Sequence, residues 1–175
     1  MNTLKQLLKG KWNYNIKDNK LICRNHSGLT YVFENKDNFF FQELLTTLNR
    51  SGRANPELNV EYESPEVQMP LELFHRVLRS NEVIYEQLVG LRQSPEGLFC
   101  FSEYTKDFKL NHHEYDDVKQ VYIDPQRMCK ITRRIRDRER VRTKIAIEDK
   151  RIVLECEFPW TTLIILMPTV PANMG

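Results

Sequence analysis

The sequence lacks the features that would place the chain in a membrane, outside the cell or around a metal ion. Its longest uninterrupted apolar run, Leu163–Met167, is far shorter than the roughly 20 residues that a membrane-spanning helix needs. Polar residues follow Met1–Lys5, so we expect no signal-peptide core. The four cysteines are widely separated, and no Cys-x-x-Cys pair or zinc-type Cys/His spacing occurs. We therefore expect a soluble protein of a reducing compartment, with buried structural thiols and no metal.

Motifs that mark common catalytic sites are also missing. No Gly-rich phosphate loop and no Gly-x-Ser-x-Gly nucleophile elbow occurs. His112 and His113 are adjacent, and because neighbouring strand residues point to opposite faces, the pair would not bind one ion. His75, between Phe74 and Arg76, is typical of a packing histidine. The sequence contains no internal repeat and no interdomain linker.

The composition is that of one globular domain. At 175 residues, 41% hydrophobic and 29% charged, the chain can bury a core, which excludes disorder and a collagen-like fold. A net charge of +2 is too balanced for a protein that coats nucleic acid.

The charge is nevertheless unevenly distributed. Between Arg127 and Arg151 eleven Lys and Arg stand against four Asp and Glu, a local +7 that leaves −5 for the rest of the chain. Such a segment attracts carboxylates, phosphates or an acidic protein. The alternative is a solvated hairpin whose tip, Arg136–Glu139, alternates in charge.

Alternating apolar and polar residues predict a mainly β protein. Helical spacing and stop signals indicate a short N-terminal helix, Thr3–Lys9, and one further helix, Phe39–Asn49. The predicted strands cover residues 11–16, 20–24, 29–34, 59–63, 73–79, 84–91, 98–104, 118–123, 128–135, 141–147, 151–158 and 161–166. Many short strands with tight turns favour an antiparallel meander, and hence a barrel or a sandwich.

The strand predicted at 141–147 carries cations on one face. A period of two sends Arg140, Arg142 and Lys144 to one side and Val141, Thr143 and Ile145 to the other. Two guanidinium groups about 7 Å apart would clamp two carboxylates of one ligand, because each planar fork pairs bidentately. In a small barrel this face would line the ligand cavity.

Several short segments occur in the order seen in one known family. They are Gly10-Lys11-Trp12, Val60–Ser64, Leu78-Arg79 followed by Gly90, Gly97–Tyr104, Arg140–Thr143 and Cys156-Glu157. With them the chain resembles the S-type phycobiliprotein lyases, lipocalin-like proteins that deliver open-chain tetrapyrroles (bilins) to phycobiliproteins. The resemblance covers residues 10–158.

The resemblance implies a mainly β fold, an antiparallel up-and-down barrel of the lipocalin or fatty-acid-binding-protein type. One short N-terminal helix and one further helix would accompany the barrel. Residues 1–175 would form a single β-barrel domain in which 159–175 is a C-terminal extension.

The same resemblance implies an enzyme, a bilin lyase or bilin chaperone. A phycobilin would bind inside the barrel and be joined by a thioether bond to a cysteine of a phycobiliprotein subunit. The bilin-binding residues would be Arg140 and Arg142 for the propionates and Trp12, Tyr14 and Tyr62 for the rings. The lyase would act chiefly by positioning the bilin, because the attacking thiolate belongs to the acceptor.

Two carboxylates, Glu157 and Glu103, would be the catalytic residues. A buried carboxylate would hydrogen-bond the pyrrole N–H groups and favour the protonated bilin. The structural alternatives are that both glutamates are outward-facing strand residues paired with lysines, and that Trp12 packs at the closed end of the barrel.

The implied partners are a phycobilin and an α or β phycobiliprotein subunit of the phycobilisome. The protein would need no cofactor of its own, since phycocyanobilin or phycoerythrobilin is the substrate, and nucleic acid is not an expected partner. A homodimer stays open. The location would be the cytoplasm of a photosynthetic cyanobacterium or the plastid stroma of an alga. Two other functions also stay open: a module that binds RNA or an acidic protein through residues 127–151, and a carrier of another apolar carboxylate.

Overall fold

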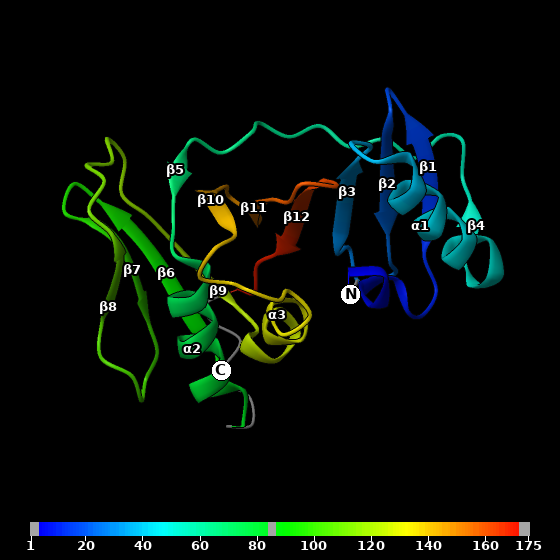
Figure 1. Ribbon diagram of the computed structural model, residues 1–175. Coiled ribbons are helices and arrows are strands. Elements are labelled where there is room, and N and C mark those ends of the chain that lie inside the picture. Colours follow the sequence, from blue (N-terminus) through cyan, green and yellow to red (C-terminus); the bar gives the residue numbers. More distant parts are fainter. Residues whose placement is uncertain (1–3, 84–86, 172–175) are drawn as a thin grey trace.

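A computed structural model describes residues 4–83 and 87–171 of the chain (Figure 1). Its helices are the short 3₁₀ helix η1 (Leu4–Leu8) and the α-helices α1 (Asn38–Ser51), α2 (Leu71–Glu82) and α3 (Pro125–Thr132). The first strands are β1 (Asn13–Lys17), β2 (Lys20–Arg24), β3 (Thr30–Glu34), β4 (Arg53–Ala54), β5 (Val67–Gln68) and β6 (Val89–Ser94). The others are β7 (Gly97–Phe101), β8 (Phe108–Asn111), β9 (Lys119–Ile123), β10 (Arg142–Ile147), β11 (Arg151–Glu157) and β12 (Thr162–Pro168). No helix in the described residues is long and apolar enough to cross a membrane.

The strands form two open sheets. The large sheet has the order β4-β1-β2-β3-β12-β11-β10-β5, and the small sheet has the order β8-β7-β6-β9. Within the large sheet β12 pairs antiparallel with β3, with Leu163 opposite Phe33 and Leu166 opposite Thr30. This pairing joins the N-terminal strands to the C-terminal ones in a continuous sheet.

Two β-α-β-β-β units follow one another along the chain, and the first strand of each unit pairs with a strand of the other. The first is β5-α2-β6-β7-β8 and the second is β9-α3-β10-β11-β12. β5 pairs with β10 of the second unit, and β9 pairs with β6 of the first. The sequence shows no repeat because the two units share an order of elements rather than residues.

Helix α2 occupies a segment that was predicted to be a strand, residues 73–79. Its buried Leu71, Phe74 and Leu78 recur at helical spacing and face the core. The short apolar pattern of residues 73–79 fits the period of a strand as well as that of a helix. The longer pattern that begins at Leu71 fits a helix only, and the segment is helical. The strand prediction here is wrong.

Helix α3 likewise replaces the strand predicted at 128–135. Asp124 caps the helix by accepting a hydrogen bond from the Gln126 backbone N–H at 2.9 Å, and Pro125 begins the first turn. Met128 and Ile131 are buried at helical spacing. α2 and α3 pack side by side, so the apolar face of each helix is covered by that of the other.

The main core lies between the helices and one face of each sheet. It contains η1 and α1 residues such as Leu8 and Leu44, and strand residues such as Phe33, Leu91 and Leu154. In Figure 1 the helices lie on one side of the large sheet.

The opposite face of the large sheet is covered by an extended segment, residues 55–66, which we call the linker. It joins β4 to β5 and runs across the top of the view in Figure 1. Leu58 is buried in a second cluster with sheet residues such as Ile22 and Val153. Arg151 donates a hydrogen bond to the Glu61 carbonyl at 2.7 Å. The strand predicted at 59–63 therefore lies in extended backbone that is not part of a sheet.

The predicted barrel is wrong because neither sheet closes on itself. The large sheet ends at β4 and β5, which are two residues long, and the small sheet ends at β8 and β9. No strand face in the described residues encloses a lumen. The remaining predicted strands correspond to β1–β3, β6, β7 and β9–β12, and the predicted helices to η1 and α1. Thr3 and residues 84–86, with which two predicted elements begin, lie outside the described residues, as do residues 172–175 of the expected C-terminal extension.

Candidate functional site

The helical side of the molecule carries exposed basic side chains. On the described helices η1, α2 and α3, and in the two residues after α3, every exposed charged side chain is a lysine or an arginine. We call this the basic helical surface; its residues are Lys5, Arg76, Arg79, Lys130, Arg133 and Arg134, with the half-buried Arg127 between them. The acidic residues of these helices, Glu72 and Glu82, are only partly exposed.

Arginines hold both of these glutamates in the ionised form. Arg138 Nε lies 2.7 Å from Glu72 Oε2, and this hydrogen bond keeps the pKa of Glu72 below its ordinary value. Arg133 Nη2 lies 2.5 Å from Glu82 Oε1. Burial raises the pKa of Glu82, but the hydrogen bonds to Arg133 and Cys129 and the nearby arginine charges together outweigh burial, and the pKa lies below its ordinary value. Both carboxylates are thus neutralised by arginines, and the surface around them remains basic.

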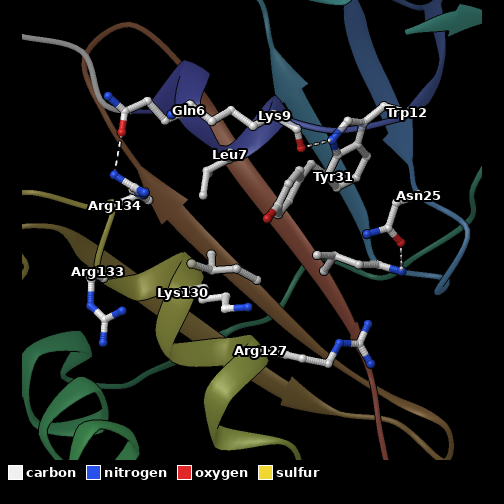
Figure 2. Close-up of a pocket in the computed structure, with 12 residues that line it drawn as sticks. Gln6, Leu7, Lys9, Trp12, Asn25, Tyr31, Arg127, Lys130, Arg133 and Arg134 are labelled. Atoms are coloured by element: carbon white, nitrogen blue, oxygen red, sulfur yellow. Dashed lines mark hydrogen bonds between the residues drawn. The ribbon is translucent and has the colours of Figure 1, made fainter. Parts of the chain in front are cut away.

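A pocket of about 460 Å³ lies between η1 and α3 within this surface (Figure 2). Basic side chains line much of its rim: Lys9, Arg127, Lys130, Arg133 and Arg134. Trp12 and Tyr31 also line it, with ring centroids 5.0 Å apart and an interplanar angle of 28°. Trp12 Nε1 donates a hydrogen bond to the Lys9 carbonyl at 3.1 Å.

Two side-chain hydrogen bonds tie α3 and the residues after it to the N-terminal part of the chain. Arg134 Nη1 donates to Gln6 Oε1 on η1 at 2.5 Å, as Figure 2 shows. Arg127 Nη2 donates to Ser27 Oγ, in the turn between β2 and β3, at 2.8 Å. The basic residues of α3 are therefore held beside η1.

A buried histidine joins α2 to α3 beneath the basic helical surface. His75 is 4% exposed, and its Nδ1 lies 2.6 Å from Thr132 Oγ1. Burial, followed by the nearby Arg138, lowers the pKa of His75. The expectation of a packing histidine is confirmed.

The arginines predicted for the propionates are exposed on the surface of the molecule. Arg142 is exposed, and its Nη1 lies 3.8 Å from Glu157 Oε2. The predicted alternation is confirmed, since Thr143 and Ile145 are buried on the core side. Arg140 and Glu157 line a cavity of about 490 Å³ next to Trp160. The structure thus brings Arg140, Arg142 and Glu157 together, on a surface rather than in a lumen.

The other predicted site residues are scattered. Trp12 is buried against Tyr31, and the Tyr14 hydroxyl donates to Asn49 Oδ1 on α1 at 2.7 Å. Tyr62 lies on the linker, with Lys20 Nζ 5.8 Å from its ring centroid. Glu103 is exposed in the loop between β7 and β8. Tyr62 and Trp12 therefore lie on opposite faces of the large sheet.

The basic segment 127–151 is not one surface. Arg127, Lys130 and Arg133 belong to the basic helical surface, whereas Lys144 and Arg151 lie on the other side of the large sheet. Sequence reasoning missed the partners of α3, since Arg76 and Arg79 lie far away in the chain. The helical spacing of Leu71, Phe74 and Leu78 is the signal that would have found them.

The four cysteines are buried and free, as the sequence pattern predicts. Burial raises the pKa of Cys129 to about 11 and that of Cys100 and Cys156 to about 12. Such thiols are unreactive at neutral pH. In the described part of the chain no three His, Cys, Asp or Glu residues come together as metal ligands.

No known protein family and no curated protein sequence matches this chain. Solved structures do match it. The DNA polymerase sliding clamp of Bacillus subtilis aligns with a TM-score of 0.51 and 16% identity over 89% of this chain and 41% of the clamp. The fold is that of a sliding clamp. The proliferating cellular nuclear antigen (PCNA) of Entamoeba histolytica aligns with a TM-score of 0.56 and 7% identity, over 90% of this chain and 88% of that protein.

The PCNA of A. fulgidus, solved with the C-terminal region of FEN-1 bound, gives a TM-score of 0.54 and 9% identity, over 91% of this chain and 89% of that one. The chain spans less than half the length of the Bacillus subtilis clamp. The two β-α-β-β-β units and the N-terminal strands together make up this clamp-like fold.

The clamp fold overturns the resemblance to bilin lyases and what it implied. The predictions of a lipocalin-like lyase, of an enzyme in photosynthesis, and of phycobilin and phycobiliprotein partners are wrong. So are the alternatives of a module acting through residues 127–151 and of a carboxylate carrier. The segments that carried the resemblance lie on elements that share no barrel: Leu78-Arg79 in α2, Val60–Ser64 in the linker and Gly97–Tyr104 from β7 into its loop.

Proposed function

We propose that this protein is a clamp-type DNA-binding protein, without catalytic activity, that holds duplex DNA against its basic helical surface. The observation that carries the proposal is the opposite charge of the helices that cover one face of the large sheet and of the linker that covers the other. Exposed charges on η1, α2 and α3 are all basic, whereas the linker on the other side has four glutamates and no lysine or arginine. This proposal reverses the expectation that nucleic acid is not a partner.

The chemistry of these side chains suits binding that is independent of base sequence. Arginine and lysine on long side chains neutralise phosphates and release counterions, which yields affinity but no sequence information. A surface of this kind allows a protein to move along DNA. Structural likeness to sliding clamps supports the same conclusion.

One chain presents its basic helical surface on one side only, so surrounding DNA would require further copies. The shared order of elements in the two β-α-β-β-β units indicates where a copy would join. β8 is the counterpart of β12, and the outer edge of β12 carries β3. The outer edge of β8 pairs with no strand among the described residues. We therefore assign the β8 edge as the contact between copies, to be tested by light scattering with and without DNA.

The decisive experiment compares two double charge reversals in DNA binding. Arg79→Glu with Lys130→Glu changes the basic helical surface, and Lys17→Glu with Arg142→Glu makes the same change of charge on the other side of the large sheet. Fluorescence anisotropy with a labelled duplex is measured over a salt series. We expect the first variant to lose about tenfold or more in affinity and to show a shallower salt dependence, by about 0.9 per lost phosphate contact.

The second variant is the matched control and should bind as the unchanged protein does. Equal losses in both variants would mean that only net charge matters, and would contradict the proposal. So would an absence of duplex binding by the unchanged protein at low salt.

A further inference from the structure

The outer face of the small sheet carries aromatic and cationic side chains in two cross-strand rows. Residues directly opposite in antiparallel strands point to the same face. In one row Phe99 of β7 lies between Lys109 of β8 and Arg92 of β6, and Arg92 is opposite Gln120 of β9. In the other, Gly90 lies between Phe101 and Tyr122. We call these residues the aromatic face: Phe99, Phe101, Tyr122, Arg92, Lys109, Gln120 and Gly90.

Cations lie directly beside the rings of this face. The Arg92 guanidinium carbon is 5.3 Å from the ring centroids of both Phe99 and Phe101. Lys109 Nζ is 5.4 Å from the Phe99 centroid. Each positive charge is therefore adjacent to a flat apolar surface, within reach of any group that stacks there.

A glycine allows the rings of the second row to meet. A Cβ added at Gly90 would lie 2.3 Å from Cζ of Phe101, so the end of that ring lies across the β6 backbone. Phe101 there contacts Tyr122, with centroids 6.0 Å apart and an interplanar angle of 80°. Gln120 Nε2 donates to the Tyr122 hydroxyl at 2.8 Å. Aromatic surface thus continues from β7 to β9 across a strand that contributes no side chain there.

These rings take no part in the cores of the molecule. Phe99, Phe101 and Tyr122 are half-buried and belong to neither hydrophobic cluster of the described residues. The equivalent outer face of the large sheet carries aliphatic residues such as Val32 and Val153, and the linker covers it. Packing therefore accounts for the apolar residues on the large sheet but not for the rings on the small one.

We propose that the aromatic face binds single-stranded nucleic acid. Bases stack on aromatic rings and on guanidinium planes, while lysine and arginine neutralise the phosphates that follow the bases. The two rows are roughly 7 Å apart along the strands, so successive bases would meet successive rows. A duplex hides the faces of its bases and cannot use these rings. The aromatic face lies on the small sheet and does not depend on the basic helical surface.

Asp107 sets how strongly the face attracts phosphate. Its Oδ2 lies 2.6 Å from Arg92 Nη2, so it competes with a phosphate for the same guanidinium. Without this charge the Arg92 guanidinium would still lie beside both phenylalanine rings and would be available to bind a phosphate. A gain in binding on removal of an acidic residue would follow from the proposal and not from a purely structural role of the rings.

The test uses a fluorescently labelled oligothymidine and the complete chain. Phe99→Leu with Phe101→Leu keeps the sites apolar and should weaken binding by about tenfold or more, given the strength of base stacking. Asp107→Asn should strengthen binding by several-fold. Thermal unfolding of each variant reports whether the fold is retained. Tyr122→Leu is a second variant, which changes the edge strand β9 and leaves the inner strand β7 unchanged.

The variant Arg79→Glu with Lys130→Glu separates this proposal from the proposed function, because it should lose duplex binding and keep oligothymidine binding. Oligothymidine binding that disappears in that variant and survives both the Phe99→Leu/Phe101→Leu and the Tyr122→Leu changes would overturn the aromatic-face proposal. An unchanged protein that does not bind oligothymidine at low salt would also overturn it and leave the face to a protein partner.

Discussion

Arg138 shows how one side chain can connect two helices. Its Nε donates to Glu72 on α2, and its Nη1 donates to the carbonyls of Thr132 at 3.3 Å and Ile135 at 3.2 Å, at and just beyond the end of α3. The carbonyls at a helix end lack partners within the helix, so a guanidinium that reaches them satisfies groups that would otherwise be exposed or unpaired. β10 begins a few residues later, at Arg142.

We expect Arg138→Ala to lower the free energy of unfolding by about 2 kcal/mol, since it removes hydrogen bonds to a partly buried carboxylate and to two carbonyls. Arg136→Ala, at an exposed neighbour, should change it by less than about 0.5 kcal/mol. Urea denaturation measures both. Equal effects would show that Arg138 does not hold the helices together.

His75 should make stability depend on pH. It faces Arg138, Glu72, Arg133 and Arg79, and its pKa lies below the ordinary value of 6.5. The His75 imidazole takes up a proton near pH 6.5 in the unfolded chain but only at lower pH in the folded protein. The contribution of His75 to stability is therefore fully present above pH 6.5 and is lost as the pH decreases toward the folded pKa. Glu72 also has a lowered pKa, and its contribution is lost in a more acidic window, as the pH falls through its folded pKa.

The measurement is urea denaturation from about pH 7.5 to about pH 5.5. His75→Asn keeps a polar group near the position of Nδ1 and should flatten the dependence in this range. His112→Ala, at an exposed histidine, should leave it unchanged. A slope that persists in His75→Asn would assign the titration to another group.

At the scale of elements, the short helix α3 depends on its N-terminal cap. Asp124 Oδ1 accepts hydrogen bonds from the backbone N–H groups of Gln126 at 2.9 Å and Arg127 at 3.5 Å. We expect Asp124→Ala to cost about 1 kcal/mol of stability and Asp124→Asn considerably less. Because α3 carries Arg127 and Lys130, the alanine variant should also weaken duplex binding. Thermal unfolding and anisotropy together test this, and an alanine variant as stable as the asparagine one would contradict it.

Elements with a sustained pattern were predictable, and short ambiguous ones were not. β10–β12 and α1 follow their alternating or helical patterns along most of their length, and their predicted bounds lie within a few residues of the observed ones. In α2 and α3 the apolar residues fit a strand over a few positions and a helix over eight or more. Tertiary packing of the two helices against each other favours the helix.

At the scale of the whole molecule, Leu58 anchors the linker to the large sheet. Leu58 is 7% exposed and lies in the cluster on the outer face of the large sheet. We expect Leu58→Ala to cost about 2 kcal/mol, and Leu58→Asp to release the linker and speed cleavage by a glutamate-specific protease within residues 55–66. Val83→Asp, at an exposed valine, is a control in which cleavage should stay slow. Unchanged cleavage in Leu58→Asp would show that other contacts hold the linker.

The sequence by itself determined which residues of each strand lie together on one face, as the split of Arg142 and Lys144 from Thr143 and Ile145 illustrates. It also determined that the cysteines are buried and that most strands lie where they do, because these properties depend on neighbours in the chain. Only the tertiary structure decided that the sheets stay open, that the face of Arg142 is an outer surface, and that Arg79 and Lys130 share one surface. The reason is physical: strand pairing and helix packing join residues that are distant in the chain, and no local pattern specifies which edge meets which.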